Sequence, residues 1–427
     1  MKASNYNIFY CQGDKNYVFQ QITKSLIQID SELFNALSHG QIEQIPKDEL
    51  NQLYDMGIVT SDDFNESDPI IIANLKNRYA SNHLRVTVMP TLNCNFRCWY
   101  CYESHKPSVM SHQSMTATLA FIKDEAIRKE KKQILLDWFG GEPMMYFEKI
   151  VYPLSKSLKD WCTENDITFS CQMTSNGSLI TLERASMMND IGLKQFQITL
   201  DGGKVIHNQT RFSKSIPNSF DRIVANIHTI CRIVQGATID LRINYTPENI
   251  DTLHQILEEF ESDIRDKIFI SPHIVWQKSE EIVHLRGKIL QLEHDAENYG
   301  YPVLRSLSRS CVSCYTENID QYVINYDLNV YKCTARDFDD KNTIGKILPD
   351  GKFQPNSLYF KFCATQAPFV NDTCLNCNIL PSCMFATSCI QKSLEKNTPK
   401  CCKELILEHI YNNISGMINY SHQTQSI

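Results

Sequence analysis

Short apolar segments alternate with amphipathic ones from residue 84 to residue 275, and this alternation constrains the fold more than any other feature. Apolar residues repeating every three to four positions are typical of helices, and short apolar runs are typical of strands. Strands alternating with helices indicate a parallel sheet with crossover helices. Strands are expected at 84–89, 134–139, 168–173, 195–200, 238–245 and 267–275. Because a closed barrel needs eight such units, we predict an α/β fold, an open partial (β/α)6 barrel.

Polar and glycine-rich stretches directly follow the first four expected strands. Three cysteines follow the first strand, Gly-Gly-Glu-Pro (140–143) the second, Thr-Ser-Asn-Gly (174–177) the third and Asp-Gly-Gly (201–203) the fourth. In parallel α/β sheets, ligands bind at the carboxyl ends of the strands, which meet at one edge. The sequence therefore predicts one site built from these four loops.

Cysteine is abundant, with 17 in 427 residues. The first residues hold no apolar stretch that would direct secretion, so we expect a cytoplasmic protein, in which thiols serve as metal ligands or catalytic groups more often than as disulfides. A run of about 18 apolar residues is missing, which argues against a membrane partner. The net charge of −7, with no long basic run, argues against nucleic acid as a partner.

Cys94, Cys98 and Cys101 form a Cys-X3-Cys-X2-Cys pattern. Three thiolates at this spacing can hold one face of a [4Fe–4S] cluster, which needs four ligands. Because no fourth cysteine lies nearby in the sequence, one iron would stay open to an exogenous ligand. Zinc is the alternative, but a zinc site prefers two Cys-X2-Cys pairs that close a tetrahedron.

This pattern, with the aromatic Tyr100 before the third cysteine and a strand before the first, resembles the radical S-adenosylmethionine (SAM) enzymes. The resemblance implies that the amino and carboxylate groups of SAM chelate the open iron. One electron from the cluster then cleaves the sulfonium to a 5′-deoxyadenosyl radical, which abstracts a hydrogen atom. The cofactor carries out the difficult step, and the protein positions and shields it.

Further stretches match motifs of this family after later strands. Residues 140–143 resemble the GGEP motif, in which the glycines let the backbone approach the ligand and the carboxylate accepts from the SAM ammonium. Residues 174–177 resemble the family's loop of polar contacts. A threonine before Asp-Gly can reach the ribose or the SAM carboxylate, and an arginine in 207–211 can clamp that carboxylate; Arg242 and Asn244 rank below it. The residues expected to bind SAM are Tyr100, Gly140, Gly141, Glu142, Pro143, Ser175, Asn176, Thr199 and Arg211.

The cysteines of the last third resemble the SPASM extension, which carries two auxiliary [4Fe–4S] clusters. The family's ligand order implies one cluster on Cys311, Cys314, Cys333 and Cys389. It implies another on Cys374, Cys377, Cys383 and Cys401 or Cys402, and it leaves Cys363 unassigned. A zinc ribbon is the alternative. Because each cluster would link distant segments, we expect the extension to fold poorly without iron.

The sequence departs from the family pattern at three places. The Cys-X5-Cys spacing of Cys383 and Cys389 is longer than the usual Cys-X3-Cys, which weakens the assignment of Cys389. Leu328 stands where a glycine usually precedes Cys333 by five residues, and the neighbouring Asn329 tolerates a left-handed turn better than most residues do. Sulfatase-maturating relatives carry an aspartate base directly after the third upstream cysteine, where this sequence has Thr334. Oxidation of a sulfatase residue is therefore disfavoured, and Asp337 is the candidate catalytic base.

Residues 1–80 are expected to form a small α+β module, with a strand at 16–19, a helix at 32–38 capped by Ser31, and a helix at 47–56. The module resembles the leader-peptide recognition element of peptide maturases, which adds an extended leader to its sheet edge; a general capping structure is the alternative. The predicted domains are 1–80, leader-recognition-like; 81–290, the radical SAM partial barrel; and 291–427, the SPASM extension.

These features predict a radical SAM/SPASM peptide maturase that forms a thioether, C–C or C–O crosslink, or another modification. Its expected cofactors are three [4Fe–4S] clusters and SAM. Its expected partners are a precursor peptide with a leader and an electron donor of the flavodoxin or ferredoxin type. The alternatives are a maturase of a folded protein, as for sulfatases, an enzyme of cofactor biosynthesis, and a non-catalytic metal scaffold.

Overall fold

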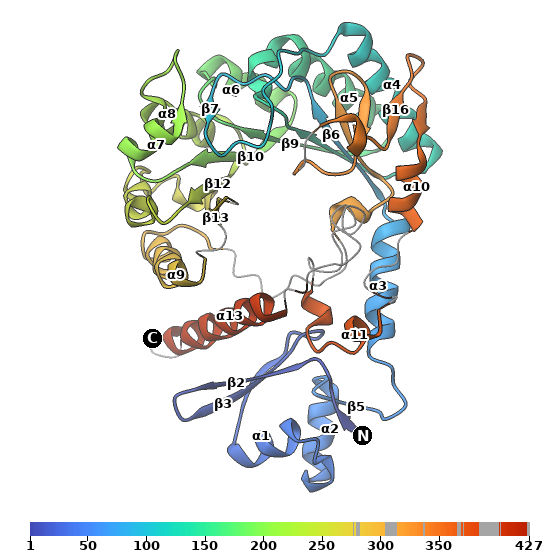
Figure 1. Cartoon of the computed structure of the whole chain (residues 1–427), viewed down its shortest axis with the longest axis vertical. Helices are drawn as coiled ribbons and strands as arrows, with labels where there is room; N and C mark the ends of the chain where they lie inside the picture. The colour runs from blue at the N-terminus through green and yellow to red at the C-terminus, as the bar shows by residue number, and fades with distance from the viewer. Residues whose placement is uncertain are drawn as a thin grey trace. The chain divides into compact units, whose positions relative to one another are not determined.

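The computed structural model describes residues 1–275, 277–278, 282–303, 314–335, 338–364, 369, 371–383, 401 and 403–424. Contacts divide the chain into two compact units, whose segments can be followed by colour in Figure 1. The N-terminal unit comprises Met1–Ser81, Arg305–Ile319 and Lys361–Ile427, and the barrel unit comprises Asn82–Leu304 and Asp320–Phe360. The segment predicted as a C-terminal extension is thus shared between the two units.

A six-stranded parallel sheet forms the centre of the barrel unit, in the order β13-β12-β10-β9-β8-β6. Val86 lies opposite Leu136, and Ile198 lies opposite Leu241, so apolar side chains face each other across neighbouring strands. The strands are β6 (His83–Met89), β8 (Gln133–Trp138), β9 (Thr168–Ser175), β10 (Leu193–Leu200), β12 (Thr238–Tyr245) and β13 (Ile268–Ile274). Each begins and ends within about two residues of its expected range, and the predicted partial (β/α)6 barrel is confirmed.

Amphipathic helices line one side of this sheet, as Figure 1 shows for α4, α5 and α6. In α8, Phe220, Ile223 and Ile227 are buried at helical spacing, which turns one stripe of the helix toward the core. Ser111 and Thr181 cap α4 and α6 by accepting backbone N–H groups of the first turn. The helices are α4 (His112–Arg128), α5 (Tyr152–Glu164), α6 (Leu182–Asp190), α7 (Lys204–Thr210), α8 (Ser219–Ile233), α9 (Ile282–Asn298), and the shorter or tighter η2 (Pro143–Tyr146), η3 (Phe147–Val151), η4 (Ile250–Glu258) and η5 (Arg265–Lys267).

Four more strands extend the sheet beyond β6. β14 pairs with β6 in parallel, and β15, β16 and β17 continue as an antiparallel meander. Leu328, in the turn between β14 and β15, adopts the left-handed φ of +69°, so this conformation falls on the residue that replaces the family's glycine and not on the neighbouring Asn329. The Leu328 side chain is buried, and this packing offsets a strain of about 1–2 kcal/mol. The elements are β14 (Gln321–Asn325), β15 (Asn329–Tyr331), β16 (Gly345–Ile347), β17 (Phe353–Pro355) and the following α10 (Ser357–Ala364).

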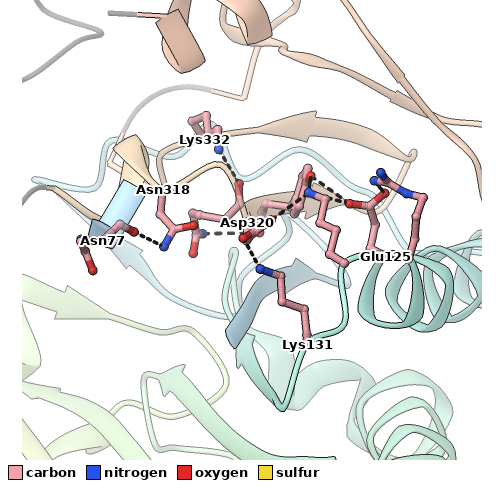
Figure 2. Close-up of polar contacts among 10 residues, drawn as sticks. Asn77, Glu125, Lys131, Asn318, Asp320 and Lys332 are labelled. Carbon is pink, nitrogen blue, oxygen red and sulfur yellow. Dashed lines mark hydrogen bonds and ion pairs between the residues drawn. The ribbon is translucent and has the colours of Figure 1, made fainter. Parts of the chain in front are cut away.

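Asp320 fixes the start of β14 to the edge of the barrel sheet. Its carboxylate, only 1% exposed, accepts from Lys129 Nζ at 2.8 Å and from Lys131 Nζ. Its carbonyl oxygen accepts from the Arg85 N–H of β6 at 3.0 Å. Figure 2 shows Lys131 directed at Asp320, and Glu125 of α4 lies 2.8 Å from the Lys129 ammonium. Because these charges are buried, each depends on its partner for compensation.

The small antiparallel sheet of the N-terminal unit, β2-β3-β4, is buried on both faces. Along β3, Val18 packs into one apolar cluster with α1 and α2, whereas Tyr17 and Phe19 pack with α13 on the other face. Asp30 rather than the predicted Ser31 caps α1, because its carboxylate accepts a first-turn N–H at 2.8 Å. The elements are β1 (Lys2–Ala3), β2 (Asn7–Gln12), β3 (Lys15–Gln20), β4 (Leu26–Ile29), β5 (Val59–Thr60), α1 (Ser31–Ser38), α2 (Lys47–Asp55), α3 (Ser67–Tyr79), α11 (Asp372–Leu375) and α13 (Lys403–Thr424).

Candidate active site

The three clustered cysteines lie on the loop after β6, at the carboxyl edge of the sheet. Cys94 is buried, Cys98 and Cys101 are half-buried, and all three are free thiols. Cys98 belongs to the short strand β7 (Arg97–Cys98), which pairs antiparallel with β11 (Arg211–Phe212) and sets Cys98 opposite Arg211. The Phe96 N–H lies 3.4 Å from the Cys94 sulfur. Main-chain contacts therefore shape the loop around its sulfurs.

Burial raises the pKa of all three thiols, to about 12 for Cys94 and to about 11 for Cys101. The nearby carboxylate of Glu142 raises the pKa of Cys94 further. Thiols in such surroundings bind a metal by exchanging their proton for it. Three sulfur donors on one loop fit one face of a [4Fe–4S] cluster. Within the described ranges, no three His, Cys, Asp or Glu side chains are arranged to hold a single metal ion.

Gly140 and Gly141 allow the loop after β8 to pack against the cysteine loop. A Cβ atom at Gly140 would lie 2.4 Å from the Thr91 carbonyl oxygen, and one at Gly141 would lie 2.1 Å from the Asn93 carbonyl oxygen. The two loops are joined by backbone hydrogen bonds, from Gly141 N to Thr91 O at 3.1 Å and from Glu142 N to Asn93 O at 2.9 Å. We expected the glycines to let the backbone approach a ligand closely. In the structure, the close approach is instead between the loop after β8 and the cysteine loop.

Glu142 clamps the loops after β8 and β9 together. It is fully buried, and its carboxylate accepts from Met144 N at 2.9 Å, Ser175 Oγ at 2.8 Å and Asn176 N at 2.7 Å. Burial raises the pKa of Glu142, although these hydrogen bonds act in the opposite direction. A carboxylate accepts about four hydrogen bonds, so one more donor can be accommodated, and the contact with the SAM ammonium stays a prediction. Pro143 begins η2, where its fixed φ favours a helix start.

Asn176 links the loop after β9 to the cysteine loop. Its Nδ2 donates to Asn95 Oδ1 at 2.8 Å and lies 3.9 Å from the Cys94 sulfur. Its Oδ1 accepts from the N–H of Ser178 at 3.0 Å, which fixes the amide orientation. Hydrogen bonds to cluster sulfurs tune the reduction potential, so this amide faces a candidate cluster ligand in a useful position. Sequence reasoning missed Asn95, whose only signal was its place inside the cysteine motif.

A buried polar network surrounds Tyr100. Its hydroxyl donates to Asp201 Oδ2 and accepts from Arg211 Nη1 at 2.7 Å and from Asn244 Nδ2 at 3.1 Å. The Arg211 and Asp201 charges lie 3.8 Å apart. Burial raises the pKa of Asp201, while the Arg211 charge lowers it. The structure thus brings together Tyr100 and Arg211, both expected to bind SAM, and adds Asp201 and Asn244 to them.

Helix α7 and the strands β10 and β12 supply further polar groups next to this network. His207 is buried, and its Nδ1 accepts from the Asp201 N–H at 3.2 Å. Burial lowers the pKa of His207 well below its usual range, so the ring is neutral and carries its proton on Nε2. Thr199 is buried on β10 opposite Arg242 of β12. Arg242 donates to Asn244 Oδ1 at 2.9 Å, so the two share a strand face as the two-residue period predicts.

A pocket of about 430 Å³ opens beside Tyr100. Trp99 and Asn244 contribute to its wall, and Glu248 and Lys278, 2.9 Å apart as an ion pair, line it as well. A volume of this size suits part of a small ligand. The pocket adjoins the cysteine loop directly, because Trp99 and Tyr100 stand between two of the cysteines in the sequence.

The described cysteines of the last third fall into both units. Cys314, Cys374, Cys377, Cys383 and Cys401 belong to the N-terminal unit, and Cys333 belongs to the barrel unit. The predicted ligands Cys311 and Cys389, the alternative Cys402 and the candidate base Asp337 lie outside the described residues. The carbonyl oxygen of Cys363 accepts from Arg78 Nη2 at 3.2 Å, which gives this residue a structural contact.

Cys374, Cys377 and Cys383 lie along one turn-rich segment. The backbone N–H groups of Cys374, Cys377, Leu380 and Cys383 each donate to the carbonyl three residues earlier, at 2.9–3.2 Å. A three-residue repeat places side chains i and i+3 above one another. The Asn371 side chain begins the segment by accepting the Cys374 N–H at 3.4 Å. Three thiols close together in one segment are compatible with the cluster that the sequence predicts, and the ligand assignment stays a prediction.

Residues 88–260 match the family model of the Radical SAM superfamily. The chain is 27% identical to the AdoMet-dependent heme synthase of Nitratidesulfovibrio vulgaris over 40% of this chain and 42% of that protein. It is 24% identical to the GTP 3′,8-cyclase of Campylobacter jejuni over 65% of this chain and 81% of that protein. The match therefore spans less than half of the heme synthase and most of the cyclase.

Solved radical SAM structures share the fold at low identity. Native anSMEcpe with bound AdoMet and Cp18Cys peptide matches 80% of this chain and 99% of that chain, with a TM-score of 0.59 at 14% identity. Streptococcus suis SuiB bound to precursor peptide SuiA matches 95% of this chain and 100% of that chain, with a TM-score of 0.50 at 13% identity. Likeness at this identity establishes the fold.

The sequence left open whether the chain is an enzyme or a non-catalytic metal scaffold, and the family match decides between these two classes. A radical SAM domain implies a [4Fe–4S] cluster and SAM, which sets aside the non-catalytic scaffold. Among the helices of the described residues, none is both long and apolar enough to cross a membrane. Residues 88–260, which include the cysteine loop and most strands of the partial barrel, form a radical SAM domain, and this chain is therefore an enzyme with a SAM-dependent radical mechanism.

Proposed function

We propose that this enzyme modifies a ribosomally made precursor peptide in the cytoplasm, forming a crosslink or another modification. The observation that carries this proposal is that 95% of the chain, and hence both of its units, aligns with a radical SAM structure described as bound to a precursor peptide. The sheet β2-β3-β4 supports it, because the outer edges of β2 and β4 pair with no other described strand and can receive an extended leader.

Different residues of the barrel unit would bind the cluster and SAM. Cys94, Cys98 and Cys101 would hold the cluster, and the pocket beside Tyr100 would take the nucleoside part of SAM. When bound, the cluster supplies the electron that splits SAM and so generates the 5′-deoxyadenosyl radical, which takes a hydrogen atom from the substrate. Glu142 would hold two loops in place beneath SAM, since it bridges them already.

We further propose two auxiliary clusters and an external electron donor. Cysteines 311, 314, 333 and 389, and cysteines 374, 377, 383 and 401 or 402, would hold two auxiliary [4Fe–4S] clusters of the SPASM type. Such clusters can accept an electron from a substrate radical, which suits a net-oxidative crosslink better than a redox-neutral epimerisation. A flavodoxin- or ferredoxin-type protein would reduce the first cluster.

Co-expression with the small open reading frame next to the gene tests the proposal. We expect mass spectrometry to find the peptide changed in mass, by loss of two hydrogen atoms for a crosslink. The variant with Cys94, Cys98 and Cys101 all replaced by Ala should leave the peptide unchanged and form no 5′-deoxyadenosine. SAM cleavage that persists in this variant would refute the cluster assignment, and an unmodified peptide with the wild type would refute the peptide substrate.

A cofactor-biosynthesis function is the second candidate, because the Campylobacter jejuni GTP 3′,8-cyclase aligns over 81% of its length. GTP, supplied without peptide, separates the two candidates. Conversion of GTP together with 5′-deoxyadenosine formation would favour the cyclase-like function. The sulfatase-type alternative is not favoured, because residue 334 is a threonine where sulfatase-maturating relatives carry an aspartate.

A further inference from the structure

We propose that Gln21, in the N-terminal sheet module, is a positioning residue for the second auxiliary cluster, to which Cys374, Cys377 and Cys383 would contribute three of the ligands. The inference rests on the proposed function, because the auxiliary clusters belong to it. The module that we expect to receive the leader peptide would then also support an iron–sulfur site.

Gln21 follows β3 and is fully buried. Its Nε2 donates to the carbonyl oxygen of Tyr6 at 2.9 Å and to that of Asn378 at 2.6 Å. Both acceptors are carbonyl oxygens, and only the amide NH2 can serve them, so the side-chain orientation is fixed. Because Asn378 directly follows Cys377, Gln21 holds the backbone next to a thiol of the site.

A second N-terminal side chain holds the other side of the same thiol. Asn5 Nδ2 donates to the carbonyl oxygen of Asn376 at 3.4 Å. The carbonyl groups of Asn376 and Asn378, which flank Cys377, are thus both bound by side chains from the first 21 residues of the chain. The orientation of the peptide units around Cys377 is therefore set from outside its own segment.

Apolar packing continues the same attachment after Cys377. Ile379 lies in one buried cluster with Ile8 and Phe19 of the sheet, and Cys377 packs against that cluster. Leu380 lies in another buried cluster with Tyr6. Figure 1 shows α13, which contributes to the first cluster, alongside β2 and β3. The segment between Cys377 and Cys383 is thereby packed on the sheet module.

These contacts make the sheet module part of the scaffold of the cluster site. Metal ligands need surrounding hydrogen bonds that fix their orientation, and losing such a partner typically lowers metal affinity by about 10–100-fold. The turn-rich segment has few apolar residues of its own, so its geometry depends on the groups that hold it from the sheet. Removal of the Gln21 donors should therefore loosen this site and leave the cysteine loop of the barrel unaffected.

The test compares Gln21→Met with Gln52→Met in the full-length, anaerobically reconstituted enzyme. Methionine keeps the length of glutamine but cannot donate, and Gln52 is an exposed residue of α2, which makes it a matched control. Three clusters give about twelve irons per chain. We expect the wild type and Gln52→Met to hold about twelve irons, and Gln21→Met to hold about eight and to lack the same spectroscopic signal as Cys374→Ala.

Asn5→Ala keeps the test decisive if Gln21→Met folds poorly, because Asn5 is exposed. Its iron should be released to a chelator in two phases, with one third of the iron leaving about tenfold faster than in the wild type. A full complement of iron in Gln21→Met, together with wild-type release from Asn5→Ala, would overturn the inference alone. About four irons in the wild type would instead overturn the auxiliary clusters of the proposed function as well.

Discussion

Tyr100 shows how a residue inside the cysteine motif is tied to three later strands. Its hydroxyl makes three hydrogen bonds in a buried setting, to Asp201, Arg211 and Asn244. In water each of these groups would be solvated, whereas here hydrogen bonds within the protein compensate for the lost water. The wall of the pocket beside Tyr100 therefore has a fixed geometry before a ligand arrives.

We expect Tyr100→Phe to lower the free energy of unfolding by about 2 kcal/mol, because it leaves buried hydrogen-bonding groups without a partner. SAM affinity should fall in parallel, since Tyr100 lines the pocket. Tyr152→Phe is the matched control, because Tyr152 makes a similar 2.6 Å bond to Asp190 at an exposed site. Denaturant unfolding and calorimetric titration with SAM measure both effects. Equal losses in the two variants would contradict the importance of the buried network.

Gly141→Ala tests the contact between the glycine and cysteine loops. The new Cβ would lie 2.1 Å from the Asn93 carbonyl oxygen, so the cysteine loop must move. We expect the variant to lose the first cluster, measured as a loss of about four irons per chain and of SAM cleavage. Gly287→Ala is the control, because a Cβ there meets nothing within 4 Å in the interior of α9. This control should be stabilised by about 0.5–1 kcal/mol. Normal cluster loading in Gly141→Ala would contradict the steric argument.

At the scale of elements, the attachment of β14 to β6 depends on buried charge. Asp320→Ala leaves Lys129 and Lys131 without their shared carboxylate, so we expect the free energy of unfolding to fall by about 3–5 kcal/mol. Asp160→Ala removes an ion pair of similar length, 2.7 Å from Lys156, in which both side chains are exposed. Its effect should be below about 0.5 kcal/mol. Similar values from chemical denaturation of the two variants would show that β14 is held by other contacts.

The same element marks the limit of prediction from the sequence. The six barrel strands were predictable because each is a local apolar run between helices. β14 is also an apolar run, but its pairing with β6 joins residues more than 200 positions apart, Tyr322 opposite Val86 for example. Partner choice at that distance is set by the open edge of the sheet and by Asp320, and no local pattern records it. The predicted extension at 291–427 therefore rests on the rise in cysteine content and not on strand pairing, and its bounds stay a prediction.

In the candidate active site, too, some residues could be predicted from the sequence and others could not. The cysteines and the residues of 140–143 were predictable because a motif places them together in the sequence. Asn244 was ranked low and Asn95 was missed, since their roles depend on side chains from other loops, Tyr100 and Asn176. Hydrogen bonds of this kind arise only after the strands are in register. Polar residues at the ends of strands therefore predict where a site lies. They do not predict which of these residues form hydrogen bonds with each other.

At the scale of the whole molecule, the two units differ in the interactions that stabilise the fold of each unit. The barrel unit has a continuous buried sheet, with residues such as Val86, Leu136 and Ile198 fully buried. The segment from Asn371 to Cys383 in the N-terminal unit consists of the short helix α11 and successive turns, and it contributes mainly Ile379 and Leu380 to apolar clusters. Metal binding is coupled to folding where the polypeptide alone cannot fix the ligands. Iron should therefore matter far more to this segment than to the barrel sheet.

Chelation of iron from the reconstituted enzyme tests this difference by hydrogen exchange. We expect the amides of 371–383 to exchange much faster in the iron-free protein, because the cysteines there lose the ligand that links them to distant segments. Amides of β8 and β9 are the internal control and should keep their protection, since the apolar core of the sheet does not involve iron. The cysteine loop at 94–101 should also exchange faster, as it holds the first cluster. Unchanged protection across 371–383 after complete iron removal would mean that the polypeptide alone fixes this segment, and that its thiols are not cluster ligands.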